Sequence, residues 1–486
     1  MHCSRQNLKS PRARRERQPA ADRGHRSLGV DAVDMASLLA ALKANATPSS
    51  YGAAIDDDDD DDAVIESAVE DESPSLTPSS TYVENAKYLL IVCVVWVHAL
   101  EDFLSRAVIV DAESWSVRKT KIEVLNPMLP YFRAWYLTLG LFVMPLFTII
   151  AGYQSKSWLE IARVHDTKAH IMLKKVRHSS TSLLGGWVVW QALYVLVDYP
   201  TVRPLQWWSP VGVTWFLLAL YIWRSSVLLF GGMKDGFIYT FVIAVAVLAG
   251  FTDTPVTANG LRFLDWQRTC TFGLYFYVGL VAVKRKHVDA TLDKFTNMSV
   301  WLRVTVGWAA VGVIFGAFRL AEYLGVPFDE VEEWVFVAAP YGFSSWYDPI
   351  REAALRVVLY VCVSFASMAF MLTVPMEKYW FTSYGSRTIV AYLLHRVLLN
   401  AYNELCTSFW DDDDISVAFQ ITMSVFVLPL VVSQVSLAPP VLKLLSPLID
   451  PVSHVTQKMP WLFNAADDAR ASGMTHDDAA DVHVRS

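Results

Sequence analysis

One apolar segment near residue 90 carries three side chains whose spacing could support chemistry. Lys87 and His98 are eleven residues apart, and Glu101 follows three residues after the histidine. At about 100° per residue, eleven residues of helix make three turns plus roughly 20°, so Lys87 and His98 would share a face about 16 Å apart. Glu101 would lie beside His98 and orient its imidazole. A histidine held by a carboxylate is suited to act as a general base, because its ordinary pKa lies near neutrality.

Four more ionisable side chains fall inside or at the ends of other apolar segments, namely Arg133, Arg224, Arg268 and His395. Ionisable groups at the depth of a bilayer are costly and usually mark function. An arginine at the end of a span also has a structural role, because it can extend its charge to the interface. His395 lies nearer the middle of its segment, where catalysis and helix packing are both open. The first segment has a structural alternative too. Lys87 would then be an anchor at the interface, Glu101 would lie in the headgroup region, and His98 would pack against a neighbouring helix.

The elements that must position these residues are membrane helices. The chain has 486 residues, of which 53% are hydrophobic and only 18% charged, and the charges are concentrated in short stretches. A soluble domain has about a quarter charged residues, whereas a membrane span needs roughly 20 apolar ones. The pattern predicts an all-α, polytopic transmembrane bundle of about ten spans, at 88–107, 131–153, 181–199, 210–231, 235–252, 268–284, 299–322, 352–375, 386–408 and 414–439.

The loops between these spans predict an orientation. Cytosolic loops of membrane proteins carry an excess of lysine and arginine. Here the basic residues follow even-numbered spans, and the acidic runs follow odd-numbered ones, so both termini are predicted to be cytosolic. The basic set is Lys156, Arg163, Lys168, Lys174, Lys175 and Arg177, then Lys284, Arg285, Lys286 and Lys294; the acidic set is Asp329, Glu330, Glu332 and Glu333, then Asp411 to Asp414.

The two ends of the chain differ in composition from this bundle. Residues 1–80 begin rich in arginine, continue through seven aspartates at Asp56–Asp62 and end rich in serine and proline. Such a segment cannot bury a core and is predicted to be disordered; an organelle transit peptide and a true start at Met35 are open alternatives. The membrane domain is predicted at 81–440, and a polar cytosolic tail at 441–486. The five scattered cysteines predict neither a disulfide framework nor a metal site, and no basic patch indicates nucleic acid.

Five short segments, occurring in order, give the chain a resemblance to a known family. They are KYLLIVCVVWVHALE at 87–101, FVMPLFTIIAGYQSK at 142–156, WFLLALYIWR at 215–224, RTCTFGLYFYVGL at 268–280 and YGSRTIVAYLLH at 384–395. Over roughly residues 82 to 400 the chain resembles the acyltransferase 3 family of integral membrane O-acyltransferases, in particular its fucose 4-O-acetyltransferase-like branch. It departs from that pattern at Lys87, Val143 and Ala151, where the family more often has arginine, histidine and serine.

The resemblance implies transfer of an acyl group, most often acetyl, from acetyl-CoA to a hydroxyl of a carbohydrate or glycan. His98, oriented by Glu101, would take the proton of the acceptor hydroxyl as it attacks the thioester carbonyl. His395 has either a structural or a catalytic role. Acetyl-CoA enters as a substrate, so neither a bound cofactor nor a metal is predicted.

The orientation separates the two substrates of that reaction. Lys87 and Arg224, near the predicted cytosolic face, would bind the phosphates of the donor. Arg133 and Arg268, near the opposite face, would bind the acceptor. The predicted partners are therefore acetyl-CoA, a carbohydrate and the lipid bilayer, in the endoplasmic reticulum, the Golgi apparatus or the plasma membrane.

Two other functions fit the same residues. A transporter or channel could use the intramembrane charges as a substrate or proton path, although corresponding halves with paired helix breaks are not evident. An acyl carrier or sensor that has lost activity is the third reading. Labelled acetyl-CoA and a His98 substitution would distinguish an enzyme from the other two.

Overall fold

The described part of the protein is built from helices. A computed structural model describes residues 78–113, 127–163, 169–197, 209–252, 263–284, 291, 294–337, 340–341, 348–405 and 417–458. These residues contain no strand, which agrees with the predicted all-α class. Contacts divide the chain into Met1–Pro74 and Ser75–Ser486. The predicted disordered region, with its alternative start, lies outside the described residues as far as residue 77.

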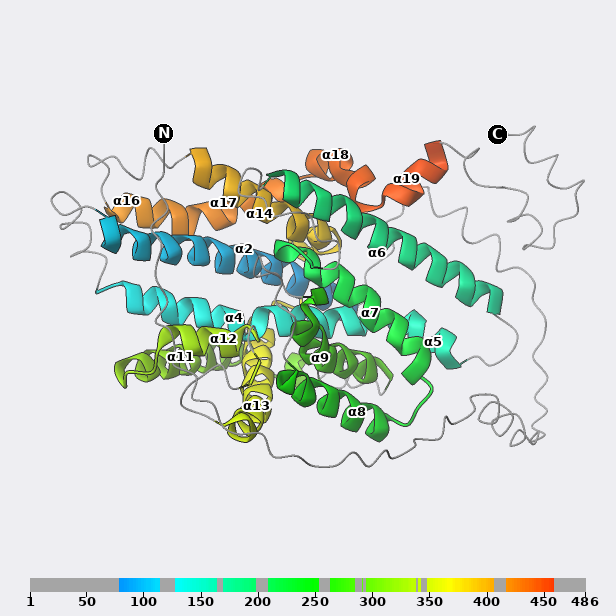
Figure 1. Ribbon diagram of the computed structural model, residues 1–486, viewed down its shortest axis with the longest axis horizontal. Helices are drawn as coiled ribbons and strands as arrows, with labels where there is room; N and C mark the ends of the chain where they lie inside the picture. Colours follow the sequence, from blue (N-terminus) through cyan, green and yellow to red (C-terminus); the bar gives the residue numbers. More distant parts are fainter. Residues whose placement is uncertain are drawn as a thin grey trace, which may run out of the picture. The chain divides into compact units, whose positions relative to one another are not determined.

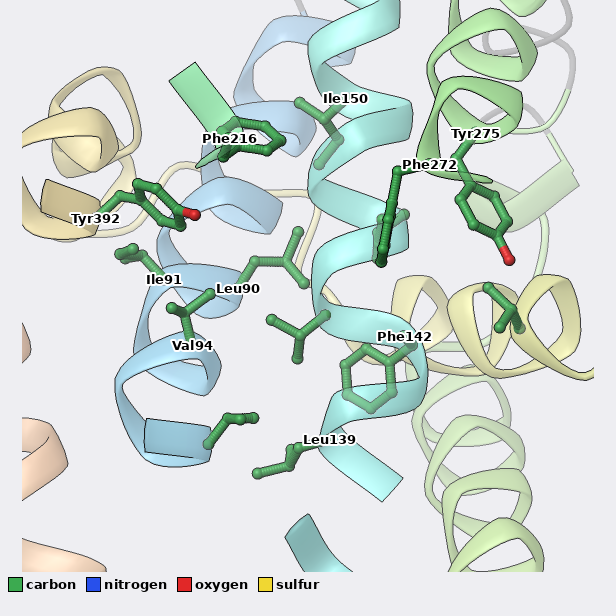
Figure 2. Close-up of a cluster of buried hydrophobic side chains, with 14 of the residues drawn as sticks. Leu90, Ile91, Val94, Leu139, Phe142, Ile150, Phe216, Phe272, Tyr275 and Tyr392 are labelled. Atoms are coloured by element: carbon green, nitrogen blue, oxygen red, sulfur yellow. The ribbon is translucent and has the colours of Figure 1, made fainter. Parts of the chain in front are cut away.

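Three helices form the centre of the bundle: α2 (Pro78–Glu113), α4 (Leu129–Tyr153) and α9 (Trp266–Lys284). Figure 2 shows α4 between side chains of α2 (Leu90, Ile91 and Val94) and of α9 (Phe272 and Tyr275). α2 and α4 run antiparallel, because Phe103 late in α2 contacts Phe132 early in α4, with ring centroids 5.2 Å apart. We call the end where α2 begins the Lys87 end, and the end where α4 begins the Glu101 end.

The other elements surround this centre. α14 and α17 pack on α2, whereas α11 and α13 pack on α4 (Figure 1). The remaining described elements are α5 (Lys156–Arg163), α6 (Ala169–Val197), η2 (Gly212–Thr214), α7 (Trp215–Phe230), α8 (Asp235–Leu248), η3 (Ala249–Phe251), η4 (Phe263–Asp265), α11 (Val300–Tyr323), α12 (Phe328–Val335), α13 (Pro349–Thr373), η5 (Thr382–Arg387), α14 (Thr388–Leu405), α16 (Val417–Ile421), the π-helical η6 (Thr422–Val427), α17 (Leu428–Leu437), α18 (Pro439–Ile449) and α19 (Pro451–Lys458).

Seven described helices are long and apolar enough to cross a membrane, so the chain is a multi-pass membrane protein by length and composition. They are Ser80–Ser105, Leu129–Tyr153, Ser179–Val197, Gly212–Phe230, Val300–Tyr323, Pro349–Thr373 and Ala418–Leu437. The other three predicted spans are helical too, as α8, α9 and α14. α8 is short, with 14 residues, and α9 and α14 are lower in hydropathy because they carry polar residues. The count of ten spans and the cytosolic termini remain predictions.

Helices α4 and α9 touch backbone to backbone through two glycines. A methyl group on Gly279 would meet the carbonyl oxygen of Ile149, and one on Gly152 would meet the carbonyl oxygen of Phe276. Small residues at helix crossings allow this close approach in membranes. The contact fixes the axial position of α9, and therefore of Arg268 near its first turn.

We expect Gly279→Ala to destabilise the protein by about 1–3 kcal/mol, because the added methyl overlaps backbone atoms that cannot move independently. The measurement is thermal unfolding of the detergent-solubilised protein. Gly312→Ala in α11 is the matched control, since nothing lies within 4 Å of a methyl group there. Alanine favours a helix over glycine by about 1 kcal/mol, so the control should be neutral or slightly stabilised. Equal melting temperatures for both variants would contradict the backbone contact.

Helical structure continues past the predicted end of the membrane domain. α18 and α19 pack against α6, where a methyl group on Gly186 would meet the carbonyl oxygen of Ile449 and one on Gly185 would contact Val452. The first part of the segment assigned to the polar tail is therefore attached to the bundle. Residues 459–486 lie outside the described residues.

A candidate catalytic site at the Glu101 end

Two histidines and a carboxylate meet near the Glu101 end. His98 Nδ1 lies 2.7 Å from Glu101 Oε2, as their spacing on α2 predicts. The His98 ring stacks on that of His395 from α14, with centroids 5.1 Å apart and planes inclined by 29°. His395 is fully buried, whereas 27% of the His98 side chain is exposed. Of the two histidines, the partly exposed His98 is therefore the one that a ligand can reach.

The hydrogen bonds define which nitrogen of each ring carries a hydrogen. An ionised carboxylate only accepts, so His98 Nδ1 donates to Glu101 and a neutral ring has its lone pair on Nε2. A backbone carbonyl also only accepts, so His395 Nδ1 donates to Ala391 O over 3.1 Å. The Nε2 atom of His395 is buried and has no hydrogen-bond partner in the described part of the chain. The pair thus presents two basic nitrogens, one of them at an accessible position.

Arg396 holds the carboxylates of α2 in place. Its Nη1 lies 3.0 Å from Asp102 Oδ1 and 3.6 Å from Glu101 Oε2, and Asn403 Nδ2 donates to Asp102 Oδ2 over 2.8 Å. Arg396 and Asn403 both belong to α14, as does His395. Because α14 binds α2 at three points, the relative position of the two histidines is fixed by charge as well as by packing.

A small cavity lies beside this scaffold, between α2, α14, η6 and the start of α17, with Ala99, Phe103 and Leu428 as its apolar walls. Asp102, Asn403 and Ser424 contribute its polar walls. Ser424 belongs to the π-helical turn η6, and such turns occur often at functional sites. A small space with both polar and apolar walls therefore adjoins Asp102, which binds Arg396.

Arg268 is surrounded by strained backbone. Its Nη1 lies 3.1 Å from Asp265 Oδ2, and its Nε donates to the carbonyl oxygen of Phe336 over 3.2 Å. Leu264 (φ 52°), Asp265 (φ 45°) and Val337 (φ 53°) are the non-glycine residues with positive φ in the described part of the chain. Such conformations cost about 1–3 kcal/mol each and gather at functional sites. All three lie at or next to Asp265 or Phe336, the two residues that bind Arg268. The positive charge of Arg268 also interacts with the carboxylate of Glu101.

Glu332 of α12 adds a fourth carboxylate to the site, after Glu101, Asp102 and Asp265. It accepts a hydrogen bond from the hydroxyl of Tyr136 over 2.8 Å. Burial raises the pKa of Glu332, and the nearby charges of Glu101, Asp329 and Glu333 raise it further, while the Tyr136 hydrogen bond opposes them. Glu332 therefore holds its proton more readily than an ordinary glutamate, close to the carboxylate that orients His98.

We expect Tyr136→Phe to raise the pKa of Glu332 further. The hydroxyl stabilises the ionised carboxylate, so its removal favours the protonated form. The measurement is the infrared carbonyl band of protonated carboxyl groups during a pH titration, with Glu332→Gln used to assign the band. A band that titrates at the same pH in Tyr136→Phe and in wild type would show that this hydrogen bond has no effect.

The structure places the other predicted residues as follows. Arg133 lies at the Glu101 end, 3.5 Å from Glu322 Oε1 and with its guanidinium 5.1 Å from the ring centre of Phe328. Lys87 and Arg224 lie at the Lys87 end and bind different partners. Lys87 Nζ is paired with Glu84 Oε1 over 2.7 Å, and Arg224 Nε donates to Ser155 Oγ over 3.2 Å. Lys87 is 8% exposed, so a ligand would have to share it with Glu84.

Sequence reasoning missed several contributors to the site, including Asp265 and Ser424. Tyr136 and Asn403 carried no signal of charge, and Glu332 was interpreted only as a sign of loop orientation. A signal for α14 was present, because Arg396 and Asn403 are seven residues apart and so share one face of a helix, with His395 next to Arg396 in the sequence. No protein-family model, curated protein or solved structure matches the chain. The resemblance to acyltransferases therefore rests on the five motifs alone.

Proposed function

We propose that the protein is a membrane O-acyltransferase, which transfers an acetyl group from acetyl-CoA to a hydroxyl of a carbohydrate. The observation that carries the proposal is the His98–Glu101 hydrogen bond, in which the partly exposed His98 also stacks on the buried His395 of a neighbouring helix. A general base must lie within hydrogen-bond reach of the proton it removes and be oriented by a partner. His98 Nε2 would remove the acceptor proton, while Glu101 stabilises the imidazolium that results.

In the chemical step, the acetyl group passes from the sulfur of coenzyme A to an oxygen of the acceptor. The acceptor oxygen forms a bond to the thioester carbonyl, and its proton passes to His98. The C–S bond then breaks, the thiolate of coenzyme A leaves and takes up a proton, and an acetyl ester remains on the sugar. Arg268, held by Asp265 and Phe336, is the cation nearest to Glu101 on α9 and would neutralise charge that develops on the carbonyl oxygen.

The distribution of charge supports separate sites for the two substrates. Around His98 the carboxylates of Glu101, Asp102, Asp265 and Glu332 outnumber the two cations Arg268 and Arg396, which makes that end a poor site for a polyphosphate. Lys87 lies about 16 Å along the α2 axis from His98, and Arg224 of α7 lies at the same end as Lys87. In the proposed reaction the donor binds from the Lys87 end, which would face the cytosol, and the acceptor from the Glu101 end, which would face the lumen or the outside.

The test is acetyl transfer by the purified protein in lipid nanodiscs, given [¹⁴C]acetyl-CoA and a mixture of cellular glycans. We expect label in the glycan fraction that mild alkali releases, because an O-acetyl ester is hydrolysed by base and an N-acetyl amide is not. Boiled protein and an unrelated multi-pass protein are the controls. A wild-type protein that transfers no label to any glycan or small sugar would refute the proposal.

A further inference from the structure

A cluster of aromatic rings at the Lys87 end has no part in the chemistry described above. Its members, the aromatic shelf, are Tyr88 of α2 with Tyr379, Trp380, Phe381 and Tyr384 from the turn before α14. Phe381 stacks on Tyr88 and on Tyr379, with centroids 4.6 Å and 5.5 Å apart, and Trp380 meets Tyr88 and Tyr384 edge-on at 6.0 Å. Trp380 is 67% exposed and Tyr379 is 44% exposed. The inner rings support two outer rings that are open to a ligand.

The shelf is held rigidly. Asn85, fully buried in α2, donates to the carbonyl oxygens of Pro375 and Glu377 over 2.9 Å and 2.8 Å. Its own oxygen accepts from the Thr382 hydroxyl over 2.7 Å, and that hydroxyl accepts from the Tyr379 backbone N–H over 2.8 Å. The backbone that carries the exposed rings is thus tied to α2 on both sides. A preorganised surface loses little entropy when it binds.

Cations flank the rings. The Arg387 guanidinium lies 5.3 Å from the ring centre of Tyr384, and its buried Nη1 has no hydrogen-bond partner among the described residues. Lys378 is exposed next to Tyr379, and Lys87 lies one residue before Tyr88. These three cations exceed the two local acids, Glu84 and Glu377, by one charge. The Arg387 side chain as a whole is partly exposed, and a guanidinium forms charge-assisted hydrogen bonds to phosphate oxygens.

We infer that the aromatic shelf binds the adenine nucleotide end of the acyl-CoA donor, with the purine ring on Trp380 and Tyr379 and the phosphates at Arg387 and Lys378. The inference rests on the proposed acyltransferase function, because that function supplies a nucleotide-bearing donor at this end. Flat rings beside cations match the two chemical parts of such a ligand: stacking serves the base, and charge-assisted hydrogen bonds serve the phosphates. Lys87, paired with Glu84, then has a supporting role at the rim rather than being the principal phosphate ligand.

The competing role for these rings is an aromatic belt at the membrane surface, where tryptophan and tyrosine are common. Trp301 at the start of α11 is a matched control, because it is 84% exposed and lies after the predicted cytosolic loop. Substitution distinguishes the two roles: loss of a binding residue weakens the affinity of the protein for a nucleotide, whereas loss of a belt residue does not.

The first experiment measures equilibrium binding of radiolabelled adenosine 3′,5′-bisphosphate to the full-length protein in nanodiscs. We expect Trp380→Leu and Arg387→Gln each to raise the Kd about tenfold, in line with the loss of one stacked ring or one phosphate contact. Trp301→Leu should leave the Kd unchanged. Lys378→Gln, a substitution of an exposed side chain, should weaken binding several-fold. No binding by wild type, equal binding by all variants, or equal losses in Trp380→Leu and Trp301→Leu would each overturn the inference.

The second experiment separates this subsite from the reaction itself. Acetyl-pantetheine carries the same thioester as acetyl-CoA but lacks the nucleotide. Trp380→Leu should raise the KM for acetyl-CoA about tenfold and leave the rate with acetyl-pantetheine unchanged. An equal effect on both donors would refute the shelf as a nucleotide site while leaving the proposed function intact. Nucleotide binding that depends on Trp380 in a protein that transfers no acetyl group would refute the proposed function and keep the binding site.

Discussion

His98→Ala should reduce acetyl transfer by about a hundredfold to ten-thousandfold, which is the usual contribution of a positioned general base. The structure gives the physical reason: His98 is the exposed member of the stacked pair, and Glu101 fixes its orientation through a 2.7 Å hydrogen bond. The loss should appear in the turnover number, since an alanine at this position removes no cation that could bind the donor. The measurement is the initial rate with labelled acetyl-CoA at saturating acceptor.

Three comparisons make that result interpretable. His454→Ala, in α19, removes a histidine away from the site and should retain the wild-type rate. Glu101→Gln keeps a hydrogen-bond acceptor beside His98 but removes the negative charge, so it should lose activity by about tenfold to a hundredfold. His395→Ala separates a structural from a catalytic role: a structural histidine would lower the melting temperature, and a catalytic one the rate. A His98→Ala protein that folds and keeps the wild-type rate would refute His98 as the base.

The sequence could predict those features of the site that depend on local spacing. Side chains three residues apart on a helix lie next to each other, and His98 and Glu101 are hydrogen-bonded as this spacing predicts. The separation of Lys87 from His98 along α2 follows from helix geometry in the same way. Helical class and membrane character could be predicted for a related reason, because both depend on the apolar content of continuous segments.

The contacts between helices could not be predicted in this way. Nothing in the spacing of α2 and α14 indicates that His395 stacks on His98, since the two are separated by almost 300 residues whose packing decides the distance. α9 and α14 also lower their own hydropathy with Arg268, His395 and Arg396, so two of the helices that build the site give weak signals of a span, whereas α2 and α4 give clear ones. The strained backbone around Arg268 depends on tertiary contacts with Phe336, which no propensity of Leu264 or Val337 predicts.

Arg396→Met should be the most destabilising single substitution in the site, because it leaves two carboxylates without their shared cation. The Arg396 side chain is 24% exposed and Asp102 is 16% exposed, so the pair is largely shielded from solvent. Removing one partner of a buried ion pair costs about 3–5 kcal/mol, and the residual exposure reduces the expected loss to about 2–4 kcal/mol. Thermal unfolding in detergent measures this loss of stability. The double variant Arg396→Met with Asp102→Asn should recover more than half of the loss, because it leaves no isolated charge at position 102.

Arg351→Met is the control: its 3.7 Å pair with Asp348 is 73% and 58% exposed, and such pairs contribute about 1 kcal/mol or less. A melting temperature for Arg396→Met as high as that of Arg351→Met would show that α14 is not anchored to α2 through Asp102, and the fixed position of His395 beside His98 would then need another cause.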